Sequence, residues 1–332
     1  MKDFTHLHLH SSYSILDGLN KIPDLAKRTK ELGMTSVALT DHGWMGGTIE
    51  FYKACKKEGV KPILGVEAYI TDDEDSVPKE NRHRDNHHLV MVAMNQTGYK
   101  NLLFMSSNAS VNNFYYKPRI SKTVLTAHSE GIIATSACLG NEVNHKACWE
   151  NSCYTDPEGS AEKAATFYKT IFGDRYYLEI QDNDDKAGQQ SAYNQFVIGL
   201  GKKLDIPIVI TSDAHYLRKE DKGAHDLVMA MQIKKTIAEY LSPDNEFQYG
   251  PWFYVRSPEE MWEAANKHGC PDAFHNANRI GQMCNVEIEL GKYKPPEFDI
   301  STVEDRDEFE AWLLTRHKED EAEHQTNKKE MK

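Results

Sequence analysis

The beginning of the chain carries closely spaced histidines of the kind that bind metal ions. His6, His8 and His10 stand at alternating positions in HLHLH, and Asp17 follows them. Successive side chains of an extended chain point to opposite faces, so the rings of His8 and His10 would share one side. Imidazole is the commonest protein ligand of transition metals, and carboxylates complete many such sites. We therefore expect a metal site that uses this segment.

Other candidate ligands stand at or near the ends of apolar runs much further along the chain. They are His42 in TDHG, Glu67 in LGVEAY, Cys138 in SACLG, and Asp213 and His215 in SDAH. A buried carboxylate such as Glu67 is costly unless it is paired. Histidine, carboxylate and thiolate together favour Zn, Mn or Fe over Mg or Ca. Taken singly, each histidine also fits a structural role, and Cys138 also fits a small core residue.

Short β-rich runs alternate with helical patterns, which indicates how these residues could come together. The runs span 4–9, 36–40, 62–70, 89–94, 131–135, 176–180 and 206–211; the helical patterns span 22–32, 48–58, 99–111, 161–172, 186–204, 257–267 and 272–283. This alternation predicts a closed βα barrel, with a doubly wound sheet as the alternative. In a βα barrel the C-terminal ends of the strands open on one face, where active sites are built. His88 is an exception to this reasoning, because it precedes its apolar run.

Composition excludes several classes of protein. The 332 residues are 39% hydrophobic and 27% charged, which excludes disorder for most of the chain. No apolar stretch approaches the ~18–20 residues of a spanning helix, and no signal-peptide core is visible, so we expect a cytoplasmic protein without membrane contact. The formal charge of −12 excludes broad, charge-driven binding to duplex DNA. The six cysteines show no repeated CxxC pattern, and we expect free thiols.

Nine stretches of the sequence, in order, make it similar to a known family. They are HLHLHSSYSILDG, ALTDHGWMGG, PILGVEAYI, HHLVMVAMNQTGYKNLL, NNFYYKPRI, EGIIATSACLGNE, YYLEIQ, IVITSDAHYL and AHDLVMAMQ. They resemble the PHP (polymerase and histidinol phosphatase) domain, and specifically the N-terminal PHP domain of bacterial replicative DNA polymerase III alpha subunits. The resemblance runs from about Phe4 to about Pro296. It implies an α/β fold with a distorted seven-stranded barrel and a trinuclear metal site at the strand C-terminal face.

The resemblance also implies nine metal ligands and three divalent ions. His8, His10, Glu67 and Asp213 would hold the first ion; Glu67 would bridge to a second, completed by His88 and Cys138; Asp17, His42 and His215 would hold the third. Some polymerase alpha subunits have lost several of these ligands and keep the domain as a scaffold. Every ligand position of this chain holds a competent side chain, which favours retained metal binding.

The activity implied by the resemblance is phosphoester hydrolysis at DNA 3′ ends. Bound metals would lower the pKa of a water, making it the nucleophile, and would stabilise the charge that grows on phosphate. In polymerase PHP domains this implies a 3′→5′ exonuclease with a proofreading role in DNA replication. Asp41, beside His42, is expected to orient a histidine or to be a salt-bridged surface residue.

The segment FYYKPRI holds candidate DNA contacts. Lys117 and Arg119 are expected to bind phosphate, because ammonium and guanidinium groups suit that anion. Phe114, Tyr115 and Tyr116 beside them would either stack on unpaired bases or pack in the core. The expected partners are therefore a DNA 3′ end or single strand, and a polymerase core polypeptide.

Two segments depart from the family pattern. His145, Cys148 and Cys153 lie in an unmatched stretch, where a loop with free thiols is favoured over a small zinc site. Residues 297–332 contain twelve acids and six bases and form an expected acidic tail after a barrel domain of residues 1–296. No palm-like pair of aspartates is visible, so the chain should not polymerise DNA alone. Two alternatives remain for function: a structural domain that supports a polymerase polypeptide, or a small-molecule phosphatase of the histidinol-phosphate type.

Overall fold

The computed structural model describes residues 3–72, 86–147, 156–183, 188–245, 248–292 and 310–318. The chain divides into two compact units, Met1–Glu287 and Ile288–Lys332. Of the expected acidic tail, only residues 310–318 are described, and they are helical. The separate domains expected at 1–296 and 297–332 stay a prediction. All that follows concerns the first unit.

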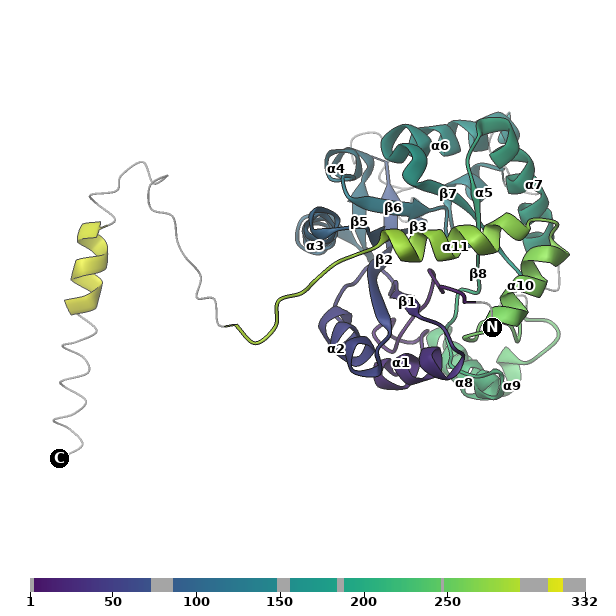
Figure 1. The fold of residues 1–332 in the computed structure, drawn as a ribbon, viewed down its shortest axis with the longest axis horizontal. Coiled ribbons are helices and arrows are strands. Elements are labelled where there is room, and N and C mark those ends of the chain that lie inside the picture. Colours follow the sequence, from purple (N-terminus) through teal and green to yellow (C-terminus); the bar gives the residue numbers. More distant parts are fainter. Residues whose placement is uncertain are drawn as a thin grey trace. The chain divides into compact units, whose positions relative to one another are not determined.

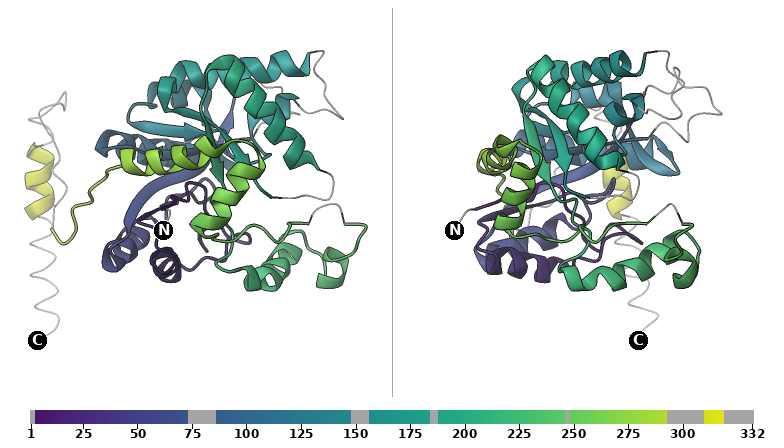
Figure 2. Two further views of the ribbon diagram at one scale, coloured as in Figure 1. Left: turned by 45° about the vertical axis from the view of Figure 1, so that its right-hand side comes forward. Right: turned by 90° about the vertical axis from the view of Figure 1, so that its right-hand side faces the viewer.

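A curled mixed sheet forms the centre of this unit (Figures 1 and 2). Its strands are β1 Ser36–Leu39, β2 Lys61–Thr71, β3 His87–Ala93, β4 Phe114–Tyr115, β5 Lys117–Ser121, β6 Ile132–Thr135, β7 Tyr176–Gln181 and β8 Ile208–Thr211. The strand order is β4-β5-β2-β3-β6-β7-β8, and β1 pairs with β2. Six of the seven predicted runs are strands, and the expected curled α/β fold of PHP type is confirmed. The short hairpin β4–β5 was not predicted.

The first predicted strand, residues 4–9, is extended but pairs only through single bridges. His6 bridges to Val37 of β1, and Leu9 bridges to Ala214 just after β8. The amide of Ala38 donates to the carbonyl of His6 at 2.8 Å, and that of His10 to the carbonyl of Ala214 at 2.9 Å. The N-terminal segment therefore lies between the two ends of the curled sheet and closes it, which a doubly wound sheet would not do.

Strand β3 runs antiparallel to its neighbours, contrary to the expectation of an all-parallel barrel. Its residues pair antiparallel with β2 on one side and with β6 on the other. The beginning of β3 therefore lies at the same edge of the sheet as the C-terminal ends of the parallel strands. This explains why His88 precedes its apolar run and still faces the other candidate ligands.

Helices surround the outside of the sheet (Figure 1). They are α1 Ile22–Glu31, α2 Thr48–Glu58, α3 Gln96–Val111, α4 Lys122–Ala127, α5 Glu142–Ala147, α6 Pro157–Phe172, α7 Gln189–Leu204, α8 Lys222–Gln232, α9 Ile237–Tyr240, α10 Pro258–Lys267 and α11 Pro271–Met283. All seven predicted helices are present; α4, α5, α8 and α9 were not predicted. At the start of α10, Ser257 and Glu260 form a capping box, as the local sequence indicates. None of the described helices is long and apolar enough to cross a bilayer.

Helix α11 covers the end of the barrel at which the parallel strands begin. The side chain of Asn276 donates to the carbonyl of Ile208 at 2.8 Å, and that of Lys61 donates to the carbonyl of Gly281 at 2.9 Å. Ile208 and Lys61 are the first residues of β8 and β2. Because α11 closes this end, the opposite end of the barrel is left for chemistry.

A close backbone contact between Gly98 of α3 and Gly131 before β6 leads to a stability prediction. A Cβ atom at Gly98 would lie 1.8 Å from the carbonyl oxygen of Gly131. We therefore expect Gly98→Ala to lower the free energy of unfolding by about 1–3 kcal/mol. Gly199 in α7 is the control, because nothing lies within 4 Å of its Cβ position. Gly199→Ala should raise stability by about 0.5–1 kcal/mol. Urea denaturation measures both, and equal effects would contradict the contact.

Candidate metal centre

All nine predicted ligands gather at the open end of the barrel, around one cavity of about 670 Å³. His8 and His10 come from the closing segment, His42 follows β1, Glu67 is within β2 and His88 is at the start of β3; Cys138 follows β6, Asp213 and His215 follow β8, and Asp17 lies in the loop before α1. The structure thus brings together residues from seven separate segments. Five of them line the cavity directly: Asp17, His42, His88, Cys138 and Asp213.

The first expected ligand group is compact and fully buried. Nε2 of His8 lies 3.2 Å from Oε1 of Glu67 and 3.1 Å from Oδ1 of Asp213. Nε2 of His10 lies 3.5 Å from Oε2 of Glu67 and 3.2 Å from the same Asp213 oxygen. The polar atoms of four side chains therefore lie close together, as the ligands of one cation do.

The second expected group shares Glu67 with the first. Nδ1 of His88 lies 2.8 Å from Oε1 of Glu67. Sγ of Cys138 lies 3.4 Å from that nitrogen and 3.6 Å from the same carboxylate oxygen. Glu67 thus stands between the two groups, where a bridging carboxylate would.

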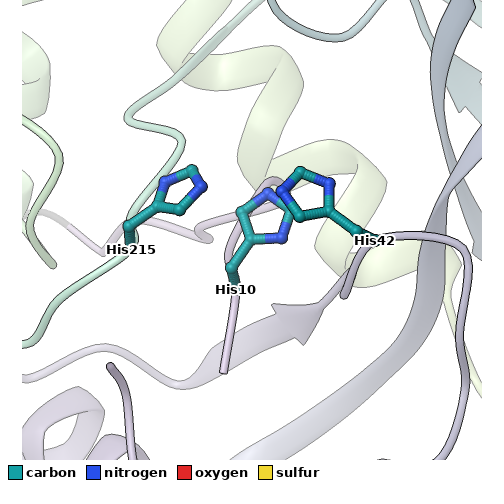
Figure 3. A group of neighbouring side chains, drawn as sticks. All are labelled: His10, His42 and His215. Atoms are coloured by element: carbon teal, nitrogen blue, oxygen red, sulfur yellow. The ribbon is translucent and has the colours of Figure 1, made fainter. Parts of the chain in front are cut away.

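The third expected group surrounds Asp17. Nε2 of His42 lies 2.9 Å from Oδ2 of Asp17, and Nε2 of His215 lies 3.4 Å from Oδ1. The rings of His42 and His215 stack against that of His10 at centroid distances of 4.1 and 4.4 Å (Figure 3). His10 therefore links this group to the first one.

Three of the histidines form their hydrogen bond through Nδ1, which leaves Nε2 of each ring without one. Nδ1 of His8 contacts the carboxylate of Glu179 at 2.8 Å, and Nδ1 of His215 contacts the carbonyl of Asp213 at 2.8 Å. Nδ1 of His10 contacts the hydroxyl of Ser14 at 3.1 Å, and that hydroxyl donates its own proton to Asp41. Each acceptor requires a proton on Nδ1, so each Nε2 presents a lone pair to the centre.

Glu179 supports His8 from within β7, and sequence reasoning missed it. Its carboxylate is buried and accepts hydrogen bonds from His8, from Gln181 at 2.9 Å, from Thr211 at 2.5 Å and from Thr135. A carboxylate behind a ligating histidine fixes the ring and raises its basicity. The signal was visible in the sequence, because Glu179 interrupts the apolar run YYLEIQ just as Glu67 interrupts its own run.

Asp41 orients a histidine, although a different one from its neighbour in sequence. Its carboxylate is buried and accepts from the amide of Ser11 at 2.6 Å and from the hydroxyl of Ser14 at 2.7 Å. Through Ser14 it fixes the ring of His10. The alternative of a salt-bridged surface residue is wrong, because Asp41 lies in the interior.

His225 of α8 is a second buried side chain that sequence reasoning missed. Its Nε2 lies 4.0 Å from Oδ1 of Asp17, and its ring lies 5.8 Å from that of His215. Burial lowers the pKa of His225 to about 3, so the ring is neutral. A single histidine in the helical segment AHDLVMAMQ carries no distinguishing signal, because such residues are commonly part of a core.

Buried polar atoms without a hydrogen bond of standard geometry test whether the site fits metal ions. Seven such atoms lie together in the centre: Nε2 of His8, His10 and His215, Nδ1 of His42, Oδ1 of Asp17 and Asp213, and Oε2 of Glu67. Buried polar atoms without a hydrogen bond are uncommon in proteins, because each is a desolvated group. These seven combine imidazole nitrogens with carboxylate oxygens, the donors that transition metals prefer. The residues therefore fit divalent cations, which would satisfy all of them together.

The electrostatics of the centre also favour cations. Burial lowers the pKa of His42, but Glu67 and Asp17 outweigh burial and raise it to about 10. Burial raises the pKa of Glu67, but His88, His8 and His42 outweigh burial and hold it well below its usual range. The carboxylates are therefore ionised, and protons on the histidines balance them. Divalent cations would displace these protons, which makes metal affinity fall as pH falls.

Strained backbone positions occur beside candidate ligands. Among the described non-glycine residues, Leu16, Ala137 and Asp213 have φ values of 62°, 63° and 49°. Leu16 precedes Asp17 and Ala137 precedes Cys138. The left-handed conformation costs of order 1 kcal/mol or more per residue and persists where surrounding structure enforces it. At these three places it turns the chain so that a donor side chain faces the centre.

The residues that are predicted to contact DNA differ in their exposure to solvent. Lys117 is exposed and lines the cavity, with its Nζ 5.1 Å from the ring centre of Tyr69. Arg119 is only 2% exposed, and its guanidinium donates to Asn113 at 3.2 Å. The phosphate contact predicted for Arg119 is therefore wrong in this conformation, because the side chain is buried in the hairpin. Phe114, Tyr115 and Tyr116 are exposed, so the core-packing alternative is wrong for them.

The residues of the second, small zinc site lie wholly or partly outside the described part of the chain. Cys148 and Cys153 lie outside the described residues, and only the backbone of His145, within α5, is described.

Comparison with known proteins decides the family. A model of the family described as "PHP domain" matches residues 6–183, which is more than half of the chain. The chain belongs to the PHP domain family. The matched range contains seven of the nine candidate ligands; Asp213 and His215 lie beyond it.

Curated relatives of this PHP domain are named DNA polymerase III subunit alpha. The chain is 41% identical over 306 residues to that of Campylobacter jejuni, covering 90% of this chain and 24% of the relative. It is 43% identical over 301 residues to that of Helicobacter pylori strain 26695, covering 89% and 24%. It is 38% identical over 310 residues to that of Aquifex aeolicus, covering 90% and 26%. The chain spans about a quarter of the length of these relatives, and the expected resemblance to polymerase III alpha is confirmed.

A solved structure, of a candidate metal-dependent phosphoesterase from Bifidobacterium adolescentis, covers 80% of this chain and 97% of its own. It is 12% identical, with a TM-score of 0.42, so no argument rests on it.

The contact between Glu179 and His8 leads to a prediction about metal affinity. In Glu179→Gln an NH2 group replaces one carboxylate oxygen, so a hydrogen-bond donor would face some of the four groups that now donate to Glu179. The ring of His8 would then lose its fixed orientation. We expect the affinity for Zn²⁺ to fall about 10–100-fold. Competition with a chromophoric chelator at pH 7.5 measures it.

Glu162→Gln is the matched control, because Glu162 pairs at the surface with Lys203. It should leave the zinc affinity unchanged. An unchanged affinity in Glu179→Gln would show that His8 does not depend on Glu179.

Proposed function

We propose that this PHP domain is a metal-dependent phosphoesterase that hydrolyses phosphodiesters at DNA 3′ ends. The observation that carries the proposal is the set of buried nitrogen and oxygen atoms, without hydrogen bonds of standard geometry, that face one another beside an open cavity. Such a set suits cations that a substrate can reach. A purely structural metal site would be closed on all sides.

Three divalent cations, as Zn, Mn or Fe, are proposed for the nine ligands. When bound, such cations activate water at neutral pH and neutralise charge on phosphate oxygens. The chain's own residues set up this chemistry. Glu179 and Asp41 fix the rings of His8 and His10, directly and through Ser14, so that their Nε2 atoms face the centre.

Lys117 supplies the phosphate contact in this proposal. It stands at the cavity, and it is the one lysine or arginine among the described lining residues. Its Nζ lies 5.1 Å from the ring centre of Tyr69, and the ring of His88 lies 5.1 Å from that same ring, so both residues border Tyr69 in the cavity lining. A phosphate bound beside the metal ligands would therefore also contact Nζ of Lys117.

DNA is proposed as the substrate because the relatives are DNA polymerase subunits. The exposed aromatic residues of the β4–β5 hairpin, next to Lys117, suit stacking on unpaired bases. A polymerase core polypeptide is proposed as the partner, because this chain matches only about a quarter of each relative. Removal of a 3′ nucleotide would then serve proofreading during replication.

Hydrolysis of a labelled primer tests the proposal. The purified chain, with bound metal measured by elemental analysis, is incubated with a 5′-labelled primer and, separately, with a small phosphomonoester. We expect the primer to shorten from its 3′ end. Asp213→Asn should reduce the rate by at least about 100-fold, because it removes the negative charge of a carboxylate that faces both His8 and His10.

Asp24→Asn, at an exposed ion pair with Lys27, is the control and should leave the rate unchanged. Shortening that survives in Asp213→Asn would overturn the site. Turnover of the monoester alone would favour a small-molecule phosphatase. Full metal occupancy without turnover of either substrate would favour a structural role in support of a polymerase.

A further inference from the structure

The cavity above the metal ligands has the size and lining of a site for one nucleotide. We propose that it binds a single unpaired 3′-terminal nucleotide, with Trp44 as the stacking surface for the base and Asn183 as a hydrogen-bond acceptor for it. This inference rests on the proposed function, since it names how the DNA end would reach the centre.

The size of the cavity excludes a base-paired end. Its volume of about 670 Å³ equals a cube with an edge of roughly 9 Å, within the ~300–1,000 Å³ usual for small-ligand sites. The major groove of B-DNA alone is about 12 Å wide, so a duplex cannot enter. A terminal nucleotide must therefore separate from its partner, which costs least at a mismatch.

Trp44 provides an aromatic surface at the rim. It follows the candidate ligand His42 by two residues, lines the cavity, and is 45% exposed. Tyr13, beside it in the lining, is fixed by a hydrogen bond from its hydroxyl to Glu50 at 3.0 Å. A Cβ atom at Gly47 would lie 2.9 Å from Cδ2 of Tyr13, so glycine makes room for that ring. A base stacked on Trp44 would therefore rest on a rigid part of the rim.

Asn183 lines the same cavity, and its side chain has an acceptor without a hydrogen-bond partner. Its side-chain nitrogen donates to the side-chain oxygen of Gln181 at 3.1 Å and to the carbonyl of Ser212 at 3.4 Å. Its Oδ1 is buried and has no hydrogen-bond partner, and the residue is only 4% exposed. A buried acceptor that lacks a donor is costly unless a ligand supplies one. The N–H groups of a nucleobase edge are suitable donors.

The charge of the lining fits one phosphate and not a long backbone. Five candidate metal ligands form the floor, and Lys117 is the single lysine or arginine in the described lining. Carboxamide side chains, among them those of Gln181, Gln190 and Gln232, line the cavity where further lysines or arginines could have stood. A site for duplex DNA would contact many phosphates with many cations. This lining instead matches a ligand with one phosphate and one polar, flat base.

Binding measurements test this inference separately from catalysis. Two primer–template duplexes carry a 5′-fluorescein and a phosphorothioate at the last primer linkage; one has a paired 3′ end and the other two mismatched 3′ nucleotides. Fluorescence anisotropy gives Kd for the metal-loaded chain. We expect the mismatched end to bind at least tenfold more tightly than the paired end.

Substitutions at the rim assign the effect to stacking. Trp44→Ala should weaken binding of the mismatched end by about 5- to 150-fold, while Trp44→Phe retains most of the affinity. Phe104→Ala is the matched control, because Phe104 is an aromatic residue of α3 that is 47% exposed and does not line the cavity, and it should change nothing. Circular dichroism confirms that each variant is folded.

The outcomes separate the two proposals. Equal affinity for paired and mismatched ends, or no loss in Trp44→Ala, would overturn the nucleotide site. An equal loss in Trp44→Phe would assign Trp44 a packing role and overturn stacking. If the wild-type chain hydrolyses no diester but still prefers mismatched ends, the proposed phosphoesterase function fails and the nucleotide site stands.

Discussion

One constraint governs the rest of this structure. Several ionised carboxylates and histidine nitrogens are buried close together, away from water. Glu67, Asp213 and Glu179 are almost fully buried, and a desolvated charge is tolerated only where opposite charge or hydrogen bonds compensate it. Glu179 obtains this from four donors within the protein. Glu67 and Asp213 face histidine nitrogens whose contacts are not hydrogen bonds of standard geometry. The centre is thus compensated only in part by the protein itself, and bound cations would complete it.

The candidate metal centre and the contacts of α11 that close the barrel lie at opposite ends of the strands. At one end of the barrel α11 binds the first residues of the strands through side-chain amides and a lysine. At the other end the strands finish in polar, sometimes left-handed residues that aim their side chains inward. Strand β3 is reversed, and this lets a residue at its beginning reach the same centre as residues at the ends of its neighbours. Most of the candidate donors therefore lie within strands or shortly after them, and loops supply the rim.

The acidity of the chain is consistent with a nucleic-acid substrate once its location is known. Half of the net charge of −12 belongs to residues 297–332. At the centre, divalent cations would add positive charge to a cluster of carboxylates and reverse the local sign facing a phosphate. The cavity itself contributes one lysine and several amides. Attraction for DNA would accordingly be local and directed at a strand end.

The sequence by itself determined the elements and the identity of the donors. Hydrophobic periodicity located six strands and seven helices, and the residue types at strand ends indicated a metal site, because side-chain alternation and strand-end polarity are local properties. Only the tertiary structure decided the direction of β3, which places His88, and the partners of Asp41 and Glu179, which fix His10 and His8. It also decided that Arg119 is buried while Trp44 faces the cavity. These outcomes depend on contacts between segments far apart in the chain, and such contacts leave no periodic trace in a single sequence.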